Sequence, residues 1–294
     1  MDGQGRELLD LATNEGASWS ARREAIAALV RLRNPEGLRG RIAAVDYCAP
    51  PLATTSATGE VGPVWQFWAQ GWEGAPPIVR SCVESVRANT SGRQHVLLSV
   101  DTLKDYLDFS PEAVARFQFW SWTKVANLVR LMLLEKYGGT WIDATVFLAA
   151  PLPRYVEDSP LFVFRRNDFR LLANWFMHSV QGHPLISACR VAYERYWMTT
   201  KERQSYFMFH FIVEAVVLSS RSLLQMWEEI PERPVPRELQ DALDEPFDAE
   251  RLREIFARSL IQKLSYKDEP LPSDGPLTFR QYIIGLERLS LAQG

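Results

Sequence analysis

A long apolar helix that runs into a strand through two glycines constrains the fold of this chain most. Residues 121–137 predict the helix from the spacing of their apolar side chains, with Lys136 in the last turn. Gly138 and Gly139 end it, since glycine is typical of a helix C-terminus. Residues 140–150 then predict a strand, and a helix followed at once by a strand indicates an α/β protein.

Strands and helices alternate through the middle of the chain, which supports the α/β class. The predicted strands are residues 64–68, 94–100, 140–150, 159–166, 171–179 and 260–267. The predicted helices are residues 20–32, 76–89, 121–137, 183–197, 206–227 and 277–292. Ser20 is a candidate cap for the first helix, and Asn34-Pro35 is its expected stop.

Composition changes divide the chain into three expected parts. Residues 49–63 are rich in Pro, Ser, Thr and Gly and predict a linker. We therefore expect an N-terminal helical appendage and linker over residues 1–62, a main domain over residues 63–276 and a C-terminal amphipathic helix over residues 277–294.

The charge balance excludes some classes of partner. Lys and Arg number 33 against 36 Asp and Glu, which gives no basic footprint for nucleic acid. The three cysteines, Cys48, Cys82 and Cys189, form no CxxC pair, and this fits a reducing compartment. With neither a secretory signal nor a membrane-spanning run predicted, we expect a cytoplasmic protein, with peripheral contact at the inner face of a membrane left open.

Asp143 is the first candidate for chemistry, because the strand predicted over residues 140–150 delivers it near its carboxyl end. Ligands of open α/β sheets bind beyond the carboxyl ends of strands. An acid there can hold a divalent cation, which can hold a diphosphate. The plainer alternative is that Gly138 and Gly139 only end the helix and that Asp143 caps a turn.

Arg130 lies among apolar neighbours, which is costly unless the guanidinium is paired or faces a cleft. Asn127 and Lys124 precede it by three and six residues, so the three side chains can share one helix face. They would form a polar stripe aimed at a phosphate or a sugar. The alternative is a structural ion pair, with Glu135 or an acid elsewhere.

Three runs carry a family resemblance, and they occur in this order: VWQFWAQGWEGAPPIVRSCVESVRAN, TKVANLVRLMLLEKYGGTWIDATVF, then NWFM with YFMFHF. They resemble the bacterial capsular polysaccharide synthesis proteins. That family is similar to the glycosyltransferase superfamily of the initiating mannosyltransferases and the clostridial glucosylating toxins. Over about residues 64–270, the resemblance implies a GT-A-like, Rossmann-related fold with helical additions. It also implies a UDP- or GDP-sugar donor and retaining transfer to a glycan or lipid-linked glycan.

The resemblance gives the aromatic segment at residues 64–72 an expected role. In the wider superfamily a tryptophan at the end of the first strand stacks on the nucleobase, and Trp65 and Gln66 match that place, with Trp68 close by. Stacking of a base on an aromatic ring contributes about 1–3 kcal/mol. The alternative is an aromatic core, and we expect one tryptophan in the nucleotide site and the others in the core.

The resemblance also implies a divalent ion, Mn²⁺ or Mg²⁺, on Asp143. The superfamily has acid-x-acid at this point, whereas this chain has Asp143-Ala144-Thr145, so Thr145 becomes the second expected ligand. A neutral hydroxyl binds such an ion more weakly than a carboxylate does. Asn127 stands where the superfamily usually has an acid that contacts the donor sugar, so the donor stays open.

Further site residues follow from the same resemblance. Lys263 is expected to neutralise the leaving phosphate, with Gln262 beside it. Asn174 and Trp175 match an element that lines the sugar site. Expected substrate contacts also include Gly138, Gly139, Lys124 and His210, although a histidine like His210 is more often part of a core. His183 precedes Pro184 and is expected at a helix entry.

Two other functions stay open at this point. With one acid of the motif missing, the chain can be a non-catalytic subunit that binds a nucleotide sugar or a glycan. A glycoside hydrolase ranks lower, because it needs two carboxylates about 5–10 Å apart and Asp143 has no evident partner. The apolar stripe of residues 277–291 can lie on a membrane, although packing on its own domain is the stronger expectation.

Overall fold

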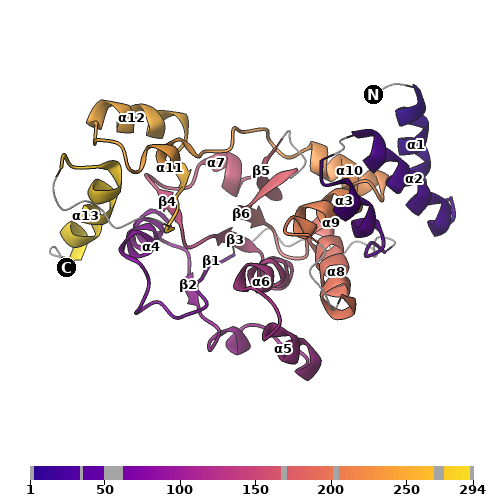
Figure 1. Cartoon of the computed structure of the whole chain (residues 1–294), viewed down its shortest axis with the longest axis horizontal. Coiled ribbons are helices and arrows are strands. Elements are labelled where there is room, and N and C mark those ends of the chain that lie inside the picture. The colour runs from indigo at the N-terminus through magenta and orange to yellow at the C-terminus, as the bar shows by residue number, and fades with distance from the viewer. Residues whose placement is uncertain are drawn as a thin grey trace.

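The computed structural model describes residues 3–33, 36–49, 62–166, 171–200, 205–267 and 275–291 and has the α/β class predicted from the sequence (Figure 1). Its strands are β1 (Val64–Phe67), β2 (His95–Leu98), β3 (Gly139–Ile142), β4 (Val146–Leu148), β5 (Leu161–Arg165), β6 (Leu172–Ser179) and β7 (Ile261–Lys263). The N-terminal and central helices are α1 (Gly3–Thr13), α2 (Trp19–Arg33), α3 (Leu38–Val45), α4 (Pro77–Asn89), the 3-10 turn η1 (Leu103–Asp105), α5 (Pro111–Phe117), α6 (Trp122–Tyr137) and α7 (Arg154–Glu157). The remaining helices are α8 (Pro184–Thr199), α9 (Met208–Val217), α10 (Arg221–Glu228), α11 (Glu238–Ala242), α12 (Ala249–Arg258) and α13 (Phe279–Leu291).

The main sheet places the loop after β3 at a functional edge. Among the described residues it has five strands in the order β2-β1-β3-β6-β5. Strand β1 pairs in parallel with β2 and β3, whereas β6 is antiparallel to both β3 and β5. Every residue of β1 and β3 is buried, as expected for central strands covered on both faces. The carboxyl ends of the parallel strands therefore share one edge, and Asp143 follows β3 there.

The two glycines after α6 are required by close backbone packing. Gly138 and Gly139 have positive φ angles of 65° and 95°. A Cβ atom on Gly138 would lie 2.6 Å from the amide nitrogen of Gln181, and one on Gly139 would lie 2.0 Å from the carbonyl oxygen of Pro63. This confirms that the pair ends the helix, and it explains why no larger residue fits.

Two predicted elements are each divided in the structure. The strand predicted over residues 140–150 is β3 and β4, because a turn at Asp143, with the Val146 amide 2.9 Å from the Asp143 carbonyl, redirects the chain to pair with β7. The helix predicted over residues 206–227 is α9 and α10. It breaks at Ser220, which is extended and bonds through its hydroxyl to Glu15 and Ser222.

Two apolar cores lie on either side of the β4–β7 pair. The larger core contains the main sheet with α6, α8, α9 and the N-terminal helices. The smaller core contains side chains of α4, α11, α12 and α13. Strand β4 joins them by alternation, since Val146 and Leu148 belong to the larger core and Phe147 belongs to the smaller one.

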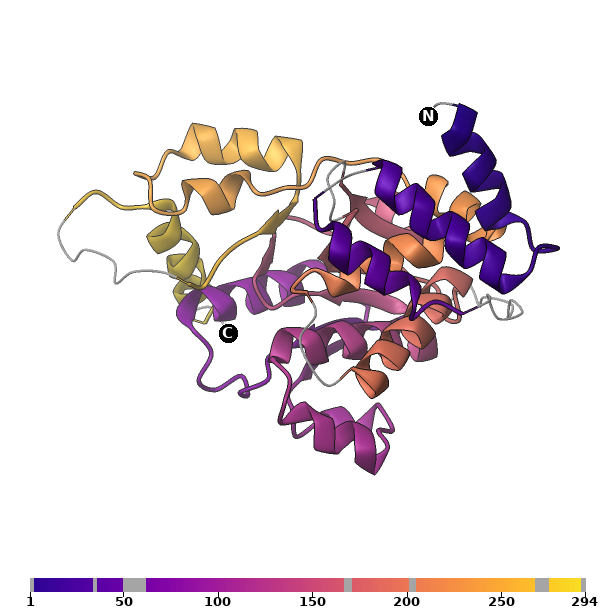
Figure 2. The same ribbon diagram turned by 45° about the vertical axis from the view of Figure 1, so that its right-hand side comes forward.

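The N-terminal helices pack on the main domain, and Figure 2 shows them beside α9 and α10. The buried Arg41 of α3 forms an ion pair with Glu214 of α9. The cap predicted for α2 is wrong: the helix begins at Trp19, because the hydroxyl of Ser18, not Ser20, accepts from the Ala21 amide at 3.3 Å. The expected stop at Asn34-Pro35 and most of the predicted linker lie outside the described residues.

The C-terminal helix α13 packs the described part of its apolar stripe, residues 279–286, against the protein. Phe279 and Ile283 are fully buried in the smaller core, and Tyr282 stacks on Phe247 with ring centroids 4.1 Å apart. Figure 2 shows α13 beside α4. Across the described residues, no helix combines the length and the apolar character that crossing a bilayer requires.

Candidate functional site

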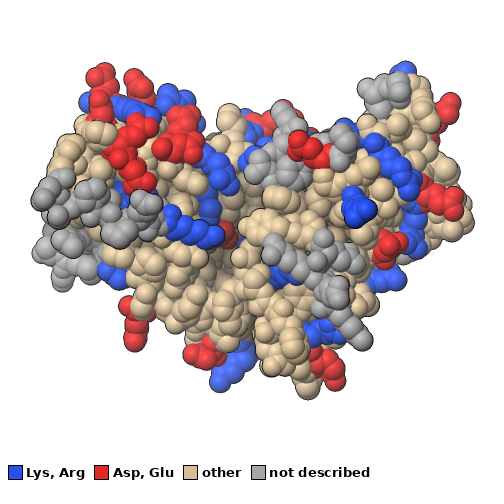
Figure 3. Space-filling view, in the orientation of Figure 1, with Lys and Arg blue, Asp and Glu red and all other residues tan. Residues whose placement is uncertain are grey.

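A cleft of about 510 Å³ opens beyond the carboxyl end of β3, between the elements of the two cores. Its volume is within the range of small-molecule sites. Figure 3 shows a hollow near the centre of this face with basic side chains around it. The described lining includes Asn127 and Arg130 of α6, Asp143 and Thr145 after β3, Asn174 and Trp175 of β6, Tyr206 and His210 beside and on α9, Arg166, Arg237, and Lys263, Tyr266 and Lys267 at and after β7.

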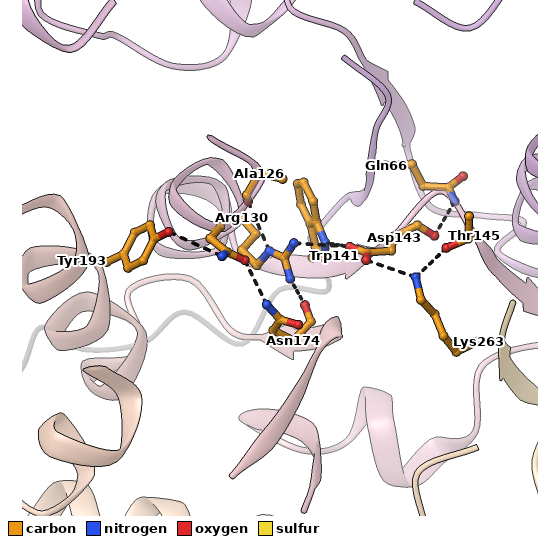
Figure 4. Close-up of polar contacts among 10 residues, drawn as sticks. Gln66, Ala126, Arg130, Trp141, Asp143, Thr145, Asn174, Tyr193 and Lys263 are labelled. Carbon is orange, nitrogen blue, oxygen red and sulfur yellow. Dashed lines mark hydrogen bonds and ion pairs between the residues drawn. The ribbon is translucent and has the colours of Figure 1, made fainter. Parts of the chain in front are cut away.

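Asp143 is part of this lining, and both of its carboxylate oxygens accept hydrogen bonds (Figure 4). Oδ1 accepts from the indole nitrogen of Trp141 at 2.8 Å and from Nη2 of Arg130 at 3.4 Å. Oδ2 accepts from Nζ of Lys263 at 3.3 Å. The carboxylate keeps 27% of its side-chain surface exposed, so a ligand in the cleft can reach it.

Arg130 is held by the backbone as well as by Asp143. Its Nε donates to the carbonyl of Ala126 at 3.2 Å, and its Nη1 donates to the carbonyl of Asn174. The guanidinium also lies over the Trp141 ring, 4.9 Å from its centroid. Burial lowers the pKa of Arg130, and the Asp143 charge opposes that shift, so the pair keeps the cation charged.

The predicted ion pair of Arg130 therefore exists, but its partner is Asp143 and not Glu135, which pairs with Arg190. Both alternatives for Arg130 hold at once. Its guanidinium is ion-paired, and it also lines the cleft. A buried cation of this kind is acceptable because its hydrogen bonds are satisfied.

Lys263 reaches Asp143 from the opposite side of the cleft, at the end of β7. Its ammonium donates to the Thr145 hydroxyl as well as to Asp143. Burial lowers the pKa of Lys263, and the charge and hydrogen bond of Asp143 oppose this shift. The ammonium therefore joins both oxygen-bearing side chains of the Asp143-Ala144-Thr145 turn (Figure 4).

Amide side chains form the next part of the wall beside Arg130. Nδ2 of Asn174 donates to Oδ1 of Asn127 at 2.9 Å, and Nδ2 of Asn127 donates to the Tyr193 hydroxyl at 3.4 Å. Burial raises the pKa of Tyr193, which keeps its hydroxyl protonated. Trp175 lies beside this pair, 4% exposed, and its ring stacks on Phe164.

Several residues predicted to contact substrate lie outside the described cleft lining. Trp65 is 1% exposed in the larger core, where its indole nitrogen donates to the Gly138 carbonyl at 2.9 Å. Gln66 is fully buried behind the site, between His95 and the carbonyl of Asp143. A nucleobase role for these two residues stays a prediction, and their burial opposes it.

Gln262, Lys124 and Trp68 also lie apart from Asp143. Gln262 is buried, and its side chain bonds to the backbone of Leu239 in α11 and of Ser259 after α12, because alternation along β7 turns it away from the side that Lys263 faces. The Lys124 ammonium lies over the Trp120 ring at 3.5 Å, at a small neighbouring pocket. Trp68 meets the cleft indirectly, through an edge contact with Tyr266 at 5.1 Å.

The structure shows where His210 and His183 lie. His210 lines the cleft at the start of α9, between the rings of Phe207 and Phe209. His183 is the residue before α8, and its ring nitrogen accepts from the Leu185 amide, which confirms the predicted helix entry.

Sequence reasoning missed two basic residues of the described cleft lining, and it also missed Trp141, which is buried behind Asp143. Trp141 had a signal in the sequence, because alternation along the predicted strand of residues 140–150 places it on the same face as Asp143. Arg166 and Arg237 lie near strand and helix ends in loops, and no local pattern marks them. With them, the described lining carries five Lys or Arg side chains and one carboxylate. The cleft therefore favours an anionic ligand.

The donor set does not fit a divalent metal ion in this arrangement. Such an ion takes several oxygen ligands at about 2.0–2.6 Å. Asp143 and Thr145 offer one carboxylate and one hydroxyl, and both already bond to the Lys263 ammonium. Within the described residues, no cluster of three or more Asp, Glu, His or Cys side chains could hold a metal. A Mn²⁺ or Mg²⁺ ion on Asp143 and Thr145 therefore stays a prediction, and the positive charges of Arg130 and Lys263 beside Asp143 oppose it.

Taken together, the fold and the site define an α/β protein with a basic cleft at the edge of its sheet. The family model described as capsular polysaccharide synthesis protein matches residues 48–283. The chain belongs to the capsular polysaccharide synthesis protein family, as its sequence runs predicted.

Two individual proteins are also similar to this chain. It is 32% identical over 160 residues to a protein named O-glycosyltransferase braB from Annulohypoxylon truncatum, over 46% of this chain and 37% of that protein. The chain thus spans little more than a third of that relative's length. The solved structure titled PaToxG Glycosyltransferase overlays with a TM-score of 0.37 and 14% identity, over 90% of this chain and 98% of that one.

Proposed function

We propose that this chain is a retaining glycosyltransferase. It moves a hexosyl unit from a nucleoside diphosphate sugar, with a UDP-sugar favoured, to a hydroxyl of a surface or capsular glycan, free or lipid-linked. The observation that carries the proposal is the convergence of Arg130 and Lys263 on Asp143 in a basic cleft beyond β3. Family membership and the name of the matched relative support the same reaction class.

The chemistry needs a stabilised leaving group. The bond between the anomeric carbon and the β-phosphate oxygen breaks, and its electron pair stays on the phosphate. The acceptor hydroxyl oxygen bonds to the anomeric carbon on the same face, and its proton passes to the leaving phosphate. Fixed cations near a developing anion lower the barrier, and in this proposal Arg130 and Lys263, which both line the cleft, supply that charge.

The remaining polar groups suit a sugar. Asp143 accepts hydrogen bonds from hydroxyls, and the Asn127 and Asn174 amides can both donate and accept. All three line the cleft with the two cations. A glycoside hydrolase is disfavoured, because Asp143 is the single carboxylate in the described lining and hydrolysis uses two.

The test is release of nucleotide from a panel of UDP- and GDP-sugars, with and without glycan acceptors. We expect one donor to be turned over by the wild type and by Asp158→Asn, a control that changes an exposed surface acid. We expect Asp143→Asn to lower that rate by about 100-fold or more, as for removal of one group that stabilises a transition state. An unchanged rate in Asp143→Asn would refute the proposed role of this site.

A second candidate is a non-catalytic subunit that binds a nucleotide sugar or a glycan. The observation that favours it is Thr145, which stands where the wider superfamily carries a second acid. The same panel separates the two functions. A donor-specific rise in melting temperature, with no release against any acceptor, would favour the binding subunit over the transferase.

A further inference from the structure

A lysine ammonium lies at the point where a metal-dependent site would need its ion. Nζ of Lys263 is 3.3 Å from Oδ2 of Asp143 and also donates to Oγ1 of Thr145. These are the two side chains that the resemblance to metal-dependent enzymes implies as ligands. Figure 4 shows both of them pointing toward the ammonium.

The other oxygen of the carboxylate is engaged as well. Oδ1 of Asp143 accepts from Trp141 at 2.8 Å and lies 3.4 Å from Nη2 of Arg130. One negative charge is therefore set against two positive charges within this group. A further divalent cation would meet net repulsion here, whereas a diphosphate would meet attraction.

The surroundings extend the same charge pattern. Arg166, Arg237 and Lys267 line the cleft outside the Asp143 group. Lys263 sits on a three-residue strand that joins the backbone on both sides, to β4 through the ladder and to Pro236 through its amide at 3.1 Å. That strand brings a point charge to the carboxylate without help from a metal.

We infer that the protonated Lys263 takes the place of a divalent ion, so that Lys263 and Arg130 hold and neutralise a nucleoside diphosphate leaving group without metal. This inference rests on the proposed function. The bond changes are those of the transfer given above, and the electron pair left on the β-phosphate is stabilised by the ammonium and the guanidinium. The Asp143 carboxylate then orients the two cations and stays open to a hydroxyl of the donor.

Calorimetric binding of UDP and GDP, in chelator or with Mn²⁺, tests the inference. We expect the wild type to bind one of them with the same affinity, within twofold, in both conditions. We expect Lys263→Ala to bind at least 30-fold more weakly in chelator, and Lys263→Arg to retain most of the affinity. Lys136→Ala, which removes an exposed lysine from the end of α6, is the matched control and should bind like the wild type.

The direct signature is binding of Mn²⁺ alone, followed by electron paramagnetic resonance. Removal of the ammonium frees Oδ2 of Asp143 and Oγ1 of Thr145, so Lys263→Ala should gain weak Mn²⁺ binding that the wild type lacks. Its UDP or GDP affinity should then recover at least tenfold with Mn²⁺. Wild-type nucleotide binding that falls more than tenfold in chelator would overturn the inference and leave the proposed function standing. Absence of nucleotide binding in every condition would instead refute the proposed function.

Discussion

Arg130 and Lys263 reach the same carboxylate from opposite walls of the cleft, but the two walls hold their cations differently. Arg130 has 3% of its side-chain surface exposed on a sixteen-residue helix of the larger core, and two backbone carbonyls accept from it. Lys263 has 16% exposed at the end of a three-residue strand, and its ammonium bonds to side chains. Arg130 therefore stabilises the fold, whereas the Lys263 ammonium can leave its side-chain partners and bind a ligand.

Substitution of Arg130 is expected to have the largest effect on folding. Arg130→Met removes the guanidinium that donates to the carbonyls of Ala126 and Asn174, and it removes one of the two cations that face Asp143. Loss of one partner of a buried pair costs about 3–5 kcal/mol. We expect urea unfolding to show that loss in the free energy of unfolding, together with a loss of nucleotide binding.

Lys263→Met is the matched comparison across the cleft. We expect its free energy of unfolding to fall by less than that of Arg130→Met, by about 1–3 kcal/mol, because Lys263 keeps 16% of its side-chain surface exposed against 3% for Arg130 and bonds to side chains and not to backbone carbonyls. Equal loss of stability in Arg130→Met and Lys263→Met would contradict the difference proposed between the two cations.

A fall in pH should destabilise mainly the larger core, which supplies one wall of the cleft. Burial lowers the pKa values of His178 and His183 to about 4, from an ordinary value near 6.5, and Arg93 adds to the shift of His178. Between about pH 6.5 and pH 4 the unfolded chain therefore binds more protons than the folded one. Stability is then lost as the pH falls, by about 1.4 kcal/mol per pH unit for each histidine.

Two measurements check this pH dependence. Urea unfolding at pH 7 and pH 5 should give a smaller difference in His178→Gln than in the wild type. Hydrogen exchange at pH 5 should open β6 before α11 to α13, a region whose sequence has no histidine. An unchanged slope in the variant would show that His178 is not a source of the acid sensitivity.

The parts of the fold that local patterns specify could be predicted from the sequence. The helix α6 and the two glycines after it were predicted, because a long apolar periodicity and a positive φ requirement are local properties. The break between β3 and β4 was missed, because apolar and β-branched residues lie on both sides of Asp143 and give a strand pattern before and after it. That break is fixed by pairing with β7, which lies far along the chain.

The same limit applies to the candidate site. Asp143 and Arg130 were predicted from local patterns, a strand end and a charged residue on an apolar helix, whereas Lys263 was predicted from the family resemblance. The three side chains do converge. Strand alternation predicts that only one of Gln262 and Lys263 faces Asp143. It does not predict which one, because the register between β7 and β4 determines that. Arg237 gave no pattern at all, and only the packing of α11 brings it to the cleft.

The smallest predicted effects distinguish Trp65, which lies in the larger core, from Trp68, which contacts a residue of the cleft lining. Trp65 packs edge-on to Tyr106 in the larger core, and its indole donates to Gly138, so Trp65→Phe should cost about 1–3 kcal/mol of stability and leave UDP or GDP affinity unchanged.

Trp68 instead contacts Tyr266 of the cleft lining. Since an aromatic pair is worth about 0.5–1.5 kcal/mol, Trp68→Leu should weaken nucleotide binding by roughly two- to tenfold. Thermal unfolding and calorimetry on both variants measure these effects. If Trp65→Phe weakened nucleotide binding and Trp68→Leu did not, the base-stacking role would belong to Trp65, and the core would have to open to admit the base.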